Sequence, residues 1–102
     1  MNKEISKKED VLNFLKTHKD YLEKNFGVTK IALFGSYARG SQKVTSDIDI
    51  LVEMKQEFKT YDNHYKLNTF LEKSFNKKVD LGYFGSVRLF IMRFIEKELI
   101  YA

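Results

Sequence analysis

Residues 30–52 read KIALFGSYARGSQKVTSDIDILV and place two short apolar segments on either side of a glycine-containing turn. The first segment, residues 30–34, is apolar and followed by a turn signal, which predicts a buried strand. The second segment, residues 47–52, alternates between acidic and apolar residues, which predicts a strand with its acids on one face. Between them, glycines bracket about one helical turn over residues 35–40, and the polar residues 41–46 form a loop.

The residues before this stretch predict one long helix. Ser6 and Glu9 have the spacing of a capping box, and apolar residues then recur at helical spacing as far as Gly27. Because glycine commonly ends a helix, we expect this helix to cover residues 7–26.

The residues after it predict a helix, a strand and a final helix. Apolar and aromatic residues at helical spacing predict a helix over residues 61–75, and residues 78–83 predict a third strand. An apolar stripe predicts a last, core-facing helix from residue 87 to about residue 100. This order predicts an α/β (α+β) fold, in which a small, mixed, twisted sheet has helices on one face.

Length and composition limit the class of protein. With 102 residues, 43% of them hydrophobic, the chain is expected to form a single domain, residues 1–102. The absence of cysteine excludes disulfides and thiolate chemistry and favours an intracellular setting. No segment approaches the roughly 18 apolar residues of a membrane span, so we expect a soluble cytoplasmic protein. The net charge of +4 is spread over scattered lysine pairs, so we expect no direct nucleic-acid binding.

Three aspartates are the candidate metal ligands. Asp47 and Asp49 lie two residues apart on a predicted strand, so their side chains point to the same side. Asp80 joins them if the third strand pairs beside the second. Carboxylates about 5 Å apart repel each other by roughly 3 kcal/mol at an effective dielectric constant near 20. The acids are therefore either separated and solvated or bound to a hard cation, for which an oxygen-only site without histidine favours Mg²⁺.

The glycine-containing turn is the candidate nucleotide-binding segment. Gly35 and Ser36 lie at the start of a short helix, whose first backbone N–H groups have no partner within the helix. Gly35 lets a phosphate approach the backbone, and Ser36 either adds a donor or serves only as a helix cap. Arg39 is either a phosphate contact or part of a structural ion pair. A phosphate-binding turn that faces acids is typical of metal-assisted phosphoryl or nucleotidyl transfer.

A family resemblance rests on Gly35-Ser36, ten intervening residues, and Asp47-x-Asp49. This pattern resembles the signature of the polymerase-β-like nucleotidyltransferase superfamily. Within that superfamily, the short chain and the motif GSYARG resemble the minimal nucleotidyltransferase (MNT) domains, which serve as antitoxins in HEPN/MNT toxin–antitoxin pairs. The resemblance covers about residues 31–100 and implies a polymerase-β-like nucleotidyltransferase fold.

The resemblance also implies a role for each candidate residue. Asp47 and Asp49 would bind Mg²⁺, and Asp80 would complete the metal site and help to activate the acceptor. All three are thus the expected metal ligands and catalytic residues. Gly35 and Ser36 match the nucleotide-binding turn. Arg39, the arginine of the motif, would add a phosphate contact.

The implied activity is the transfer of AMP from ATP to a tyrosine of a HEPN-domain RNase toxin, which silences the toxin. Tyr37 departs from the family pattern, because many relatives have arginine there, and this implies a weaker phosphate contact. Two alternatives stay open, namely a non-catalytic antitoxin that blocks the toxin sterically and a transferase with a small-molecule acceptor. A domain of this size has no second lobe to hold the acceptor, so we expect a partner protein or a homo- or hetero-oligomer.

Overall fold

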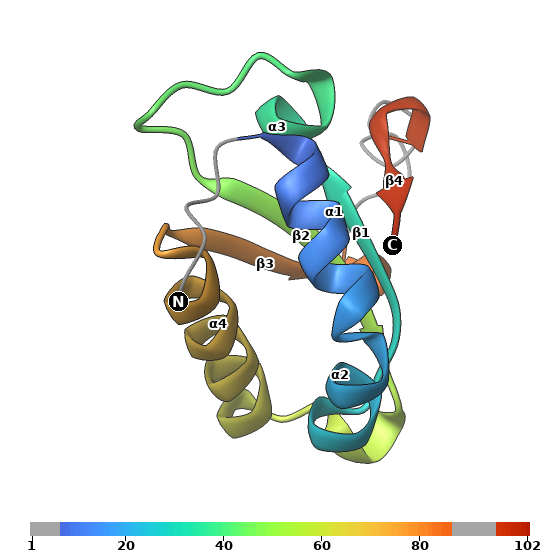
Figure 1. The fold of residues 1–102 in the computed structure, drawn as a ribbon. Helices are drawn as coiled ribbons and strands as arrows, with labels where there is room; N and C mark the ends of the chain where they lie inside the picture. Colours follow the sequence, from blue (N-terminus) through green and yellow to red (C-terminus); the bar gives the residue numbers. More distant parts are fainter. Residues whose placement is uncertain (1–6, 87–95) are drawn as a thin grey trace.

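The computed structural model describes residues 7–86 and 96–102 (Figure 1). In chain order its elements are α1 (Lys8–Thr17), α2 (Lys19–Phe26), β1 (Val28–Phe34), α3 (Gly35–Arg39), β2 (Ile48–Met54), the 3₁₀ helix η1 (Gln56–Phe58), α4 (Tyr61–Phe75), β3 (Val79–Tyr83), the 3₁₀ helices η2 (Phe84–Ser86) and η3 (Glu96–Glu98), and β4 (Ile100–Tyr101). Within these described ranges, no helix has the length and apolar character needed to cross a membrane.

The four strands form one mixed sheet in the order β3-β2-β1-β4. Strand β1 runs antiparallel to both β2 and β4, whereas β2 and β3 are parallel. This arrangement confirms the predicted small mixed sheet. It also brings the end of β1 beside the start of β2, because Phe34 pairs with Asp49.

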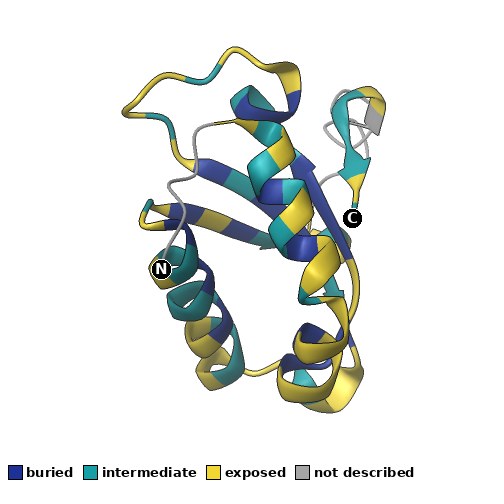
Figure 2. Ribbon diagram, viewed as in Figure 1, coloured by how far each residue is buried: buried dark blue, intermediate teal, exposed yellow. Residues whose placement is uncertain are grey.

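The three longer helices cover one face of this sheet (Figure 1). Their apolar residues share a core with alternate residues of the strands, and Figure 2 shows these residues as buried. The members of this core include Val11, Leu15, Leu22, Phe26, Leu67, Leu71 and Phe75 from the helices and Ile31, Leu33, Ile48, Ile50, Val52 and Met54 from the strands. Because side chains alternate along a strand, the residues between Ile48, Ile50 and Val52 project from the opposite face. The helices of the described part of the chain therefore leave Asp49 on the other side of the sheet.

The helix expected over residues 7–26 is interrupted in the structure. His18 has φ −99° and ψ 14°, which turns the chain away from helical geometry between α1 and α2. Its ring stacks on Phe14 with 4.0 Å between the ring centroids, and its Nδ1 lies 2.9 Å from the Phe14 carbonyl oxygen. The predicted end at Gly27 is confirmed, since Gly27 has the left-handed φ of +71°. Ser6, the predicted cap, lies outside the described residues.

The prediction of a last helix, from residue 87 to about residue 100, is wrong for residues 96–100, the part that the structure describes. The C-terminal end of the predicted helix instead forms η3 and the short strand β4, in which Ile100 pairs with Leu33 of β1. The Ala102 N–H also donates to the Ile31 carbonyl at 3.1 Å. Backbone groups along the outer edge of β1 require hydrogen-bond partners, and the C-terminal residues provide them. The remainder of the predicted helix, residues 87–95, lies outside the described residues.

The middle of the chain follows the prediction closely. Helix α4 begins and ends as expected, and its N-cap residue Thr60 accepts a hydrogen bond from the Asn63 N–H at 3.1 Å. Strand β3 lies within the predicted range 78–83. These elements place Asp80 on the edge strand of the sheet, next to β2.

Candidate active site

Asp49 and Asp80 occupy directly paired positions on neighbouring parallel strands. Paired residues of adjacent strands lie about 4.8 Å apart and project from the same face of the sheet. Asp49 is half-buried and Asp80 is exposed. Asp47 is also exposed and lies two residues before Asp49, just ahead of β2. The structure therefore confirms the strand pairing on which the predicted cluster of acids depended.

The charges of these acids act on one another. Burial raises the pKa of Asp49 above its ordinary value, and the negative charges of Asp80 and Asp47 raise it further. The positive charge of Arg39 acts on the same carboxyl group in the opposite direction. Three carboxylates and one guanidinium thus share one electrostatic environment.

The same acids do not form a preassembled metal cage. Within residues 7–86 and 96–102, no three acids or histidines lie close enough together to hold a metal ion. The strands bring Asp49 and Asp80 into register, but the three carboxylates do not converge on one point. The donor set nevertheless fits Mg²⁺, which prefers oxygen ligands. Its charge would offset both the burial of Asp49 and the repulsion from Asp80 and Asp47, which together raise the Asp49 pKa. Metal binding by these residues stays a prediction.

Gly35 holds the turn directly against the central acid. It begins α3 with a left-handed φ of +75°. A Cβ atom at this position would overlap the Oδ2 atom of Asp49 and lie 3.0 Å from its Cγ atom. Glycine is therefore required for two reasons, the backbone conformation and the close approach. The sequence suggested a close approach to phosphate, whereas the structure shows a close approach to Asp49.

The structure places Ser36 and Arg39 on the first turns after β1. Phe34 is the N-cap residue of α3, so the interpretation of Ser36 as only a helix cap is wrong. Arg39 forms an ion pair with Glu98, with 2.9 Å between its Nη1 atom and the Glu98 Oε2 atom. This confirms the ion-pair alternative for Arg39. Phosphate contacts from Ser36 and Arg39 stay predictions.

Tyr37 does not face the candidate site. Its side chain is only 1% exposed and belongs to the hydrophobic core. Many relatives have arginine at position 37, so we expected Tyr37 to make a weaker phosphate contact. Because the ring is buried in the core, Tyr37 contributes to packing and is not a candidate phosphate ligand.

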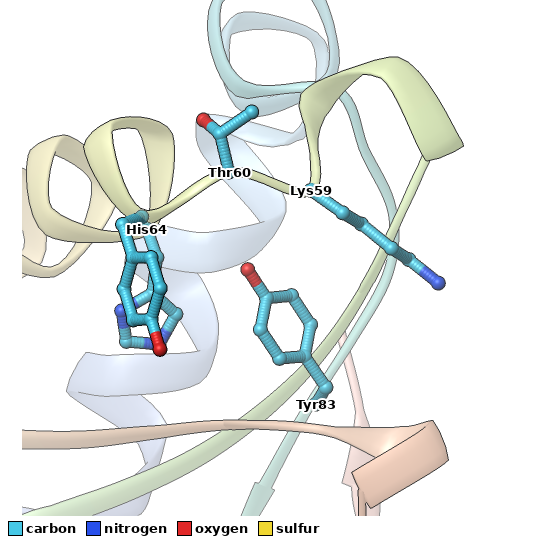
Figure 3. A pocket seen from close by; sticks show the side chains of 5 residues that line it. Lys59, Thr60, His64 and Tyr83 are labelled. Atoms are coloured by element: carbon cyan, nitrogen blue, oxygen red, sulfur yellow. The ribbon is translucent and has the colours of Figure 1, made fainter.

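A separate pocket, which the sequence did not predict, lies at the other end of β3. It has a volume of about 240 Å³ and is lined by Lys59, Thr60, Tyr61, His64 and Tyr83 (Figure 3). The Nε2 atom of His64 lies 3.0 Å from the Leu81 carbonyl oxygen. Leu81 and Tyr83 are two residues apart and both lie on the helix-covered face of β3. Asp80 projects from the opposite face. The pocket is therefore distinct from the acid cluster.

The fold and the arrangement of turn and acids define a nucleotidyltransferase domain. Residues 15–102 match the nucleotidyltransferase domain family, and the chain belongs to this family. The match includes the Gly35 turn and all three candidate acids.

Named relatives of the chain are described as protein adenylyltransferases or as candidates for that activity. The chain is 49% identical over 72 residues to a Methanocaldococcus jannaschii protein described as a candidate protein adenylyltransferase, with 71% of this chain and 83% of the relative covered. It is 36% identical over 93 residues to the protein adenylyltransferase MntA of Thermococcus cleftensis, with 91% of this chain and 93% of the relative covered. Both relatives are thus matched over most of their length.

Solved structures agree with the fold class. A structure described as a candidate minimal nucleotidyltransferase has a TM-score of 0.78 at 23% identity, with 93% of this chain and 95% of the other covered. A toxin–antitoxin crystal structure with AMP-PNP has a TM-score of 0.66 at 23% identity, with 92% of this chain and 70% of the other covered. These likenesses confirm the expected nucleotidyltransferase fold and the resemblance to minimal nucleotidyltransferases.

Proposed function

We propose that this protein is an antitoxin that transfers AMP from ATP to a tyrosine of a cognate HEPN-domain RNase toxin. The observation that carries the proposal is the pairing of Asp49 with Asp80 directly beside the Gly35 turn. The relatives carry the name protein adenylyltransferase, which supports the transfer of AMP to a protein. The likeness to a toxin–antitoxin structure with AMP-PNP is in keeping with a toxin as the acceptor and with ATP as the donor.

The turn would bind the triphosphate. Gly35 and Ser36 contribute backbone N–H groups at the start of α3, and the Ser36 hydroxyl is a further donor. The guanidinium of Arg39, whose charge reaches the acid cluster, would contact phosphate oxygens. This arrangement would hold the α-phosphate on the face of the sheet from which Asp49 projects.

Asp47, Asp49 and Asp80 would hold Mg²⁺. When bound, Mg²⁺ neutralises charge on the phosphate oxygens and lowers the repulsion between them and the carboxylates. Asp80 is exposed on the edge strand, where an acceptor can approach it. We infer that the hydroxyl oxygen of the tyrosine attacks the α-phosphorus and that pyrophosphate leaves. Asp80 accepts the proton of this hydroxyl group during the attack.

Acceptor recognition would come from the partner. The described part of the chain has one sheet with helices on one face, and the acids lie on the opposite face. The toxin would therefore dock over the acidic face and present its tyrosine to Asp80. Because the reaction consumes ATP, the proposal places the protein in the cytoplasm.

Coexpression with a candidate HEPN-domain RNase toxin tests the proposal. Wild type should abolish the RNase activity of the toxin and increase the mass of the toxin by that of at least one adenylyl group, which is AMP less one water molecule. Asp49→Asn should do neither, although it should still bind the toxin. Asp62→Asn serves as the matched control, because it removes the same negative charge from an exposed residue of α4. This variant should behave like wild type.

Two outcomes would favour the alternatives. If Asp49→Asn neutralises the toxin as well as wild type does, neutralisation occurs by steric blocking and the catalytic proposal is wrong. If AMP instead appears on a low-molecular-weight product without the toxin, the acceptor is a small molecule.

A further inference from the structure

An ion pair joins the candidate nucleotide-binding turn to the C-terminal end of the chain. The Nη1 atom of Arg39 and the Oε2 atom of Glu98 are 2.9 Å apart, and the two side chains are 51% and 31% exposed. An ion pair this exposed contributes little to the free energy of unfolding. Its effect on the position of Arg39 is therefore more important than its effect on stability.

The pairing of β4 with β1 determines where Glu98 lies. Leu33 pairs with Ile100 in antiparallel register, near the end of β1 and at the start of β4. Because α3 directly follows β1 and η3, which contains Glu98, comes just before β4, this pairing brings η3 into contact with α3. Arg39 follows Gly35 by four residues, about one helical turn, and its side chain returns to the same side of α3. The strand register thus brings the carboxylate to the guanidinium.

Contacts on the sheet hold β4 in place. The ring of Tyr101 stacks on Phe84 with 5.9 Å between the ring centroids and an angle of 5° between the planes. The Lys30 ammonium lies 5.6 Å from the centroid of Phe84 and 6.0 Å from that of Tyr101. These contacts attach the C-terminal strand to β1 and to η2, which directly follows β3 (Figure 1).

Arg39 has hydrogen-bonding capacity beyond this ion pair. A guanidinium has five N–H donors in one plane, and the bond to Glu98 is made at Nη1. Gly35, one helical turn before Arg39 in α3, lies directly against the Asp49 carboxylate. A phosphate bound between the turn and the acids would therefore lie near the guanidinium.

We propose that Glu98 is a positioning residue, which orients Arg39 so that its guanidinium faces a triphosphate at the Gly35 turn. The inference rests on the proposed function for the identity of the ligand, ATP. It predicts that Glu98 strengthens ATP binding although both are negatively charged. A Glu98 carboxylate that merely competed with phosphate for Arg39 would weaken ATP binding.

The direction in which Glu98→Gln changes the affinity for ATP tests the positioning role. We would measure the dissociation constant of ATP with Mg²⁺ by isothermal titration calorimetry on the full chain, without toxin. Glu98→Gln should weaken binding about twofold to fivefold, the size expected when one exposed ion pair is lost. General electrostatics predicts the opposite, because the substitution removes a negative charge from a protein that binds an anion. Glu57→Gln, an exposed glutamate of η1, makes the same charge change and should not weaken binding.

A double-mutant cycle separates positioning from a general structural effect. In an Arg39→Ala background, Glu98→Gln should have no further effect on ATP binding. In the transfer assay, Glu98→Gln should raise the KM for ATP by the same factor and leave kcat within about twofold of wild type. Thermal melting should show that all variants are folded.

The possible results are distinguishable. Unchanged or tighter ATP binding by Glu98→Gln, or a weakening that persists in the Arg39→Ala background, would overturn the positioning role while the proposed function stands. Failure of the wild-type protein to bind ATP would contradict the proposed function and the positioning role together.

Discussion

The α-carbon of Gly35 lies against the carboxylate of Asp49, so that a methyl group at position 35 would overlap the Asp49 Oδ2 atom. The contact follows from the sheet, because Phe34, the residue before Gly35, pairs with Asp49 across β1 and β2. The turn and the central acid therefore form one unit. A ligand that binds at the turn meets the Asp49 carboxylate as well.

Substitution of two glycines tests this contact. Gly35 and Gly40 have φ values of +75° and +76°, but a Cβ atom at Gly40 would have no neighbour within 4 Å. Alanine in a left-handed conformation costs about 1–2 kcal/mol at either position. Gly35→Ala adds the overlap with Asp49, for which overpacking suggests about 1–3 kcal/mol more. Urea unfolding should therefore show a larger loss for Gly35→Ala, and equal losses would contradict the contact.

The raised pKa of Asp49 predicts a pH dependence of stability. Burial is its main cause, followed by the charges of Asp80 and Asp47. The folded protein then binds this proton more tightly than the unfolded chain does, whose pKa is near the ordinary value of 3.8. The resulting stabilisation is present below that value and is lost as the pH rises through the raised pKa.

Asp49→Asn should accordingly be more stable than wild type at neutral pH, because the amide is never charged. The difference in free energy of unfolding should shrink as the pH falls below the raised pKa. Urea unfolding in buffer with a chelator, over a series of pH values, measures it. Asp62→Asn should show no such gain, since Asp62 pairs with Lys66 at 2.9 Å on the surface of α4. A less stable Asp49→Asn at neutral pH would show that the site does not strain Asp49.

Mg²⁺ should stabilise the wild-type protein through the same acids. A ligand at ten times its dissociation constant adds about 1.4 kcal/mol to the free energy of unfolding, which corresponds to several degrees in Tm for a domain of this size. We expect this rise in wild type and in Asp62→Asn but not in Asp49→Asn or Asp80→Asn. Differential scanning fluorimetry with increasing MgCl₂ measures it. An equal rise in all variants would mean that Mg²⁺ acts elsewhere on the protein.

The parts of the fold that could be predicted are those with strong local signals. Helix α4 combines apolar residues at helical spacing with the capping residue Thr60, and its bounds were predicted without error. The interruption at His18 was missed because the apolar residues on both sides keep helical spacing. The strand formed by Ile100 and Tyr101 was also missed, since it depends on pairing with β1, almost seventy residues earlier.

The site shows the same division. The spacing of Asp47, Asp49 and the third strand predicted that the acids share a face. The register of β2 and β3 bears this out for Asp49 and Asp80, whereas Asp47 lies just before β2 begins. An ion pair of Arg39 was one of the two alternatives, but its partner Glu98 could not be predicted, because residues 96–100 were expected in a helix and nothing local links the two side chains. Long-range pairing, rather than local propensity, determines such contacts.

Asp49 is essential to the AMP transfer that we propose for this protein. The most direct measurement incubates purified protein with Mg²⁺, ATP labelled at the α-phosphate and the candidate toxin, and follows the label on the toxin. We predict label on the toxin with wild type and with Asp62→Asn, and none with Asp49→Asn. Label from Asp49→Asn at the wild-type rate, or tight binding of wild type to the toxin without any label, would contradict the account.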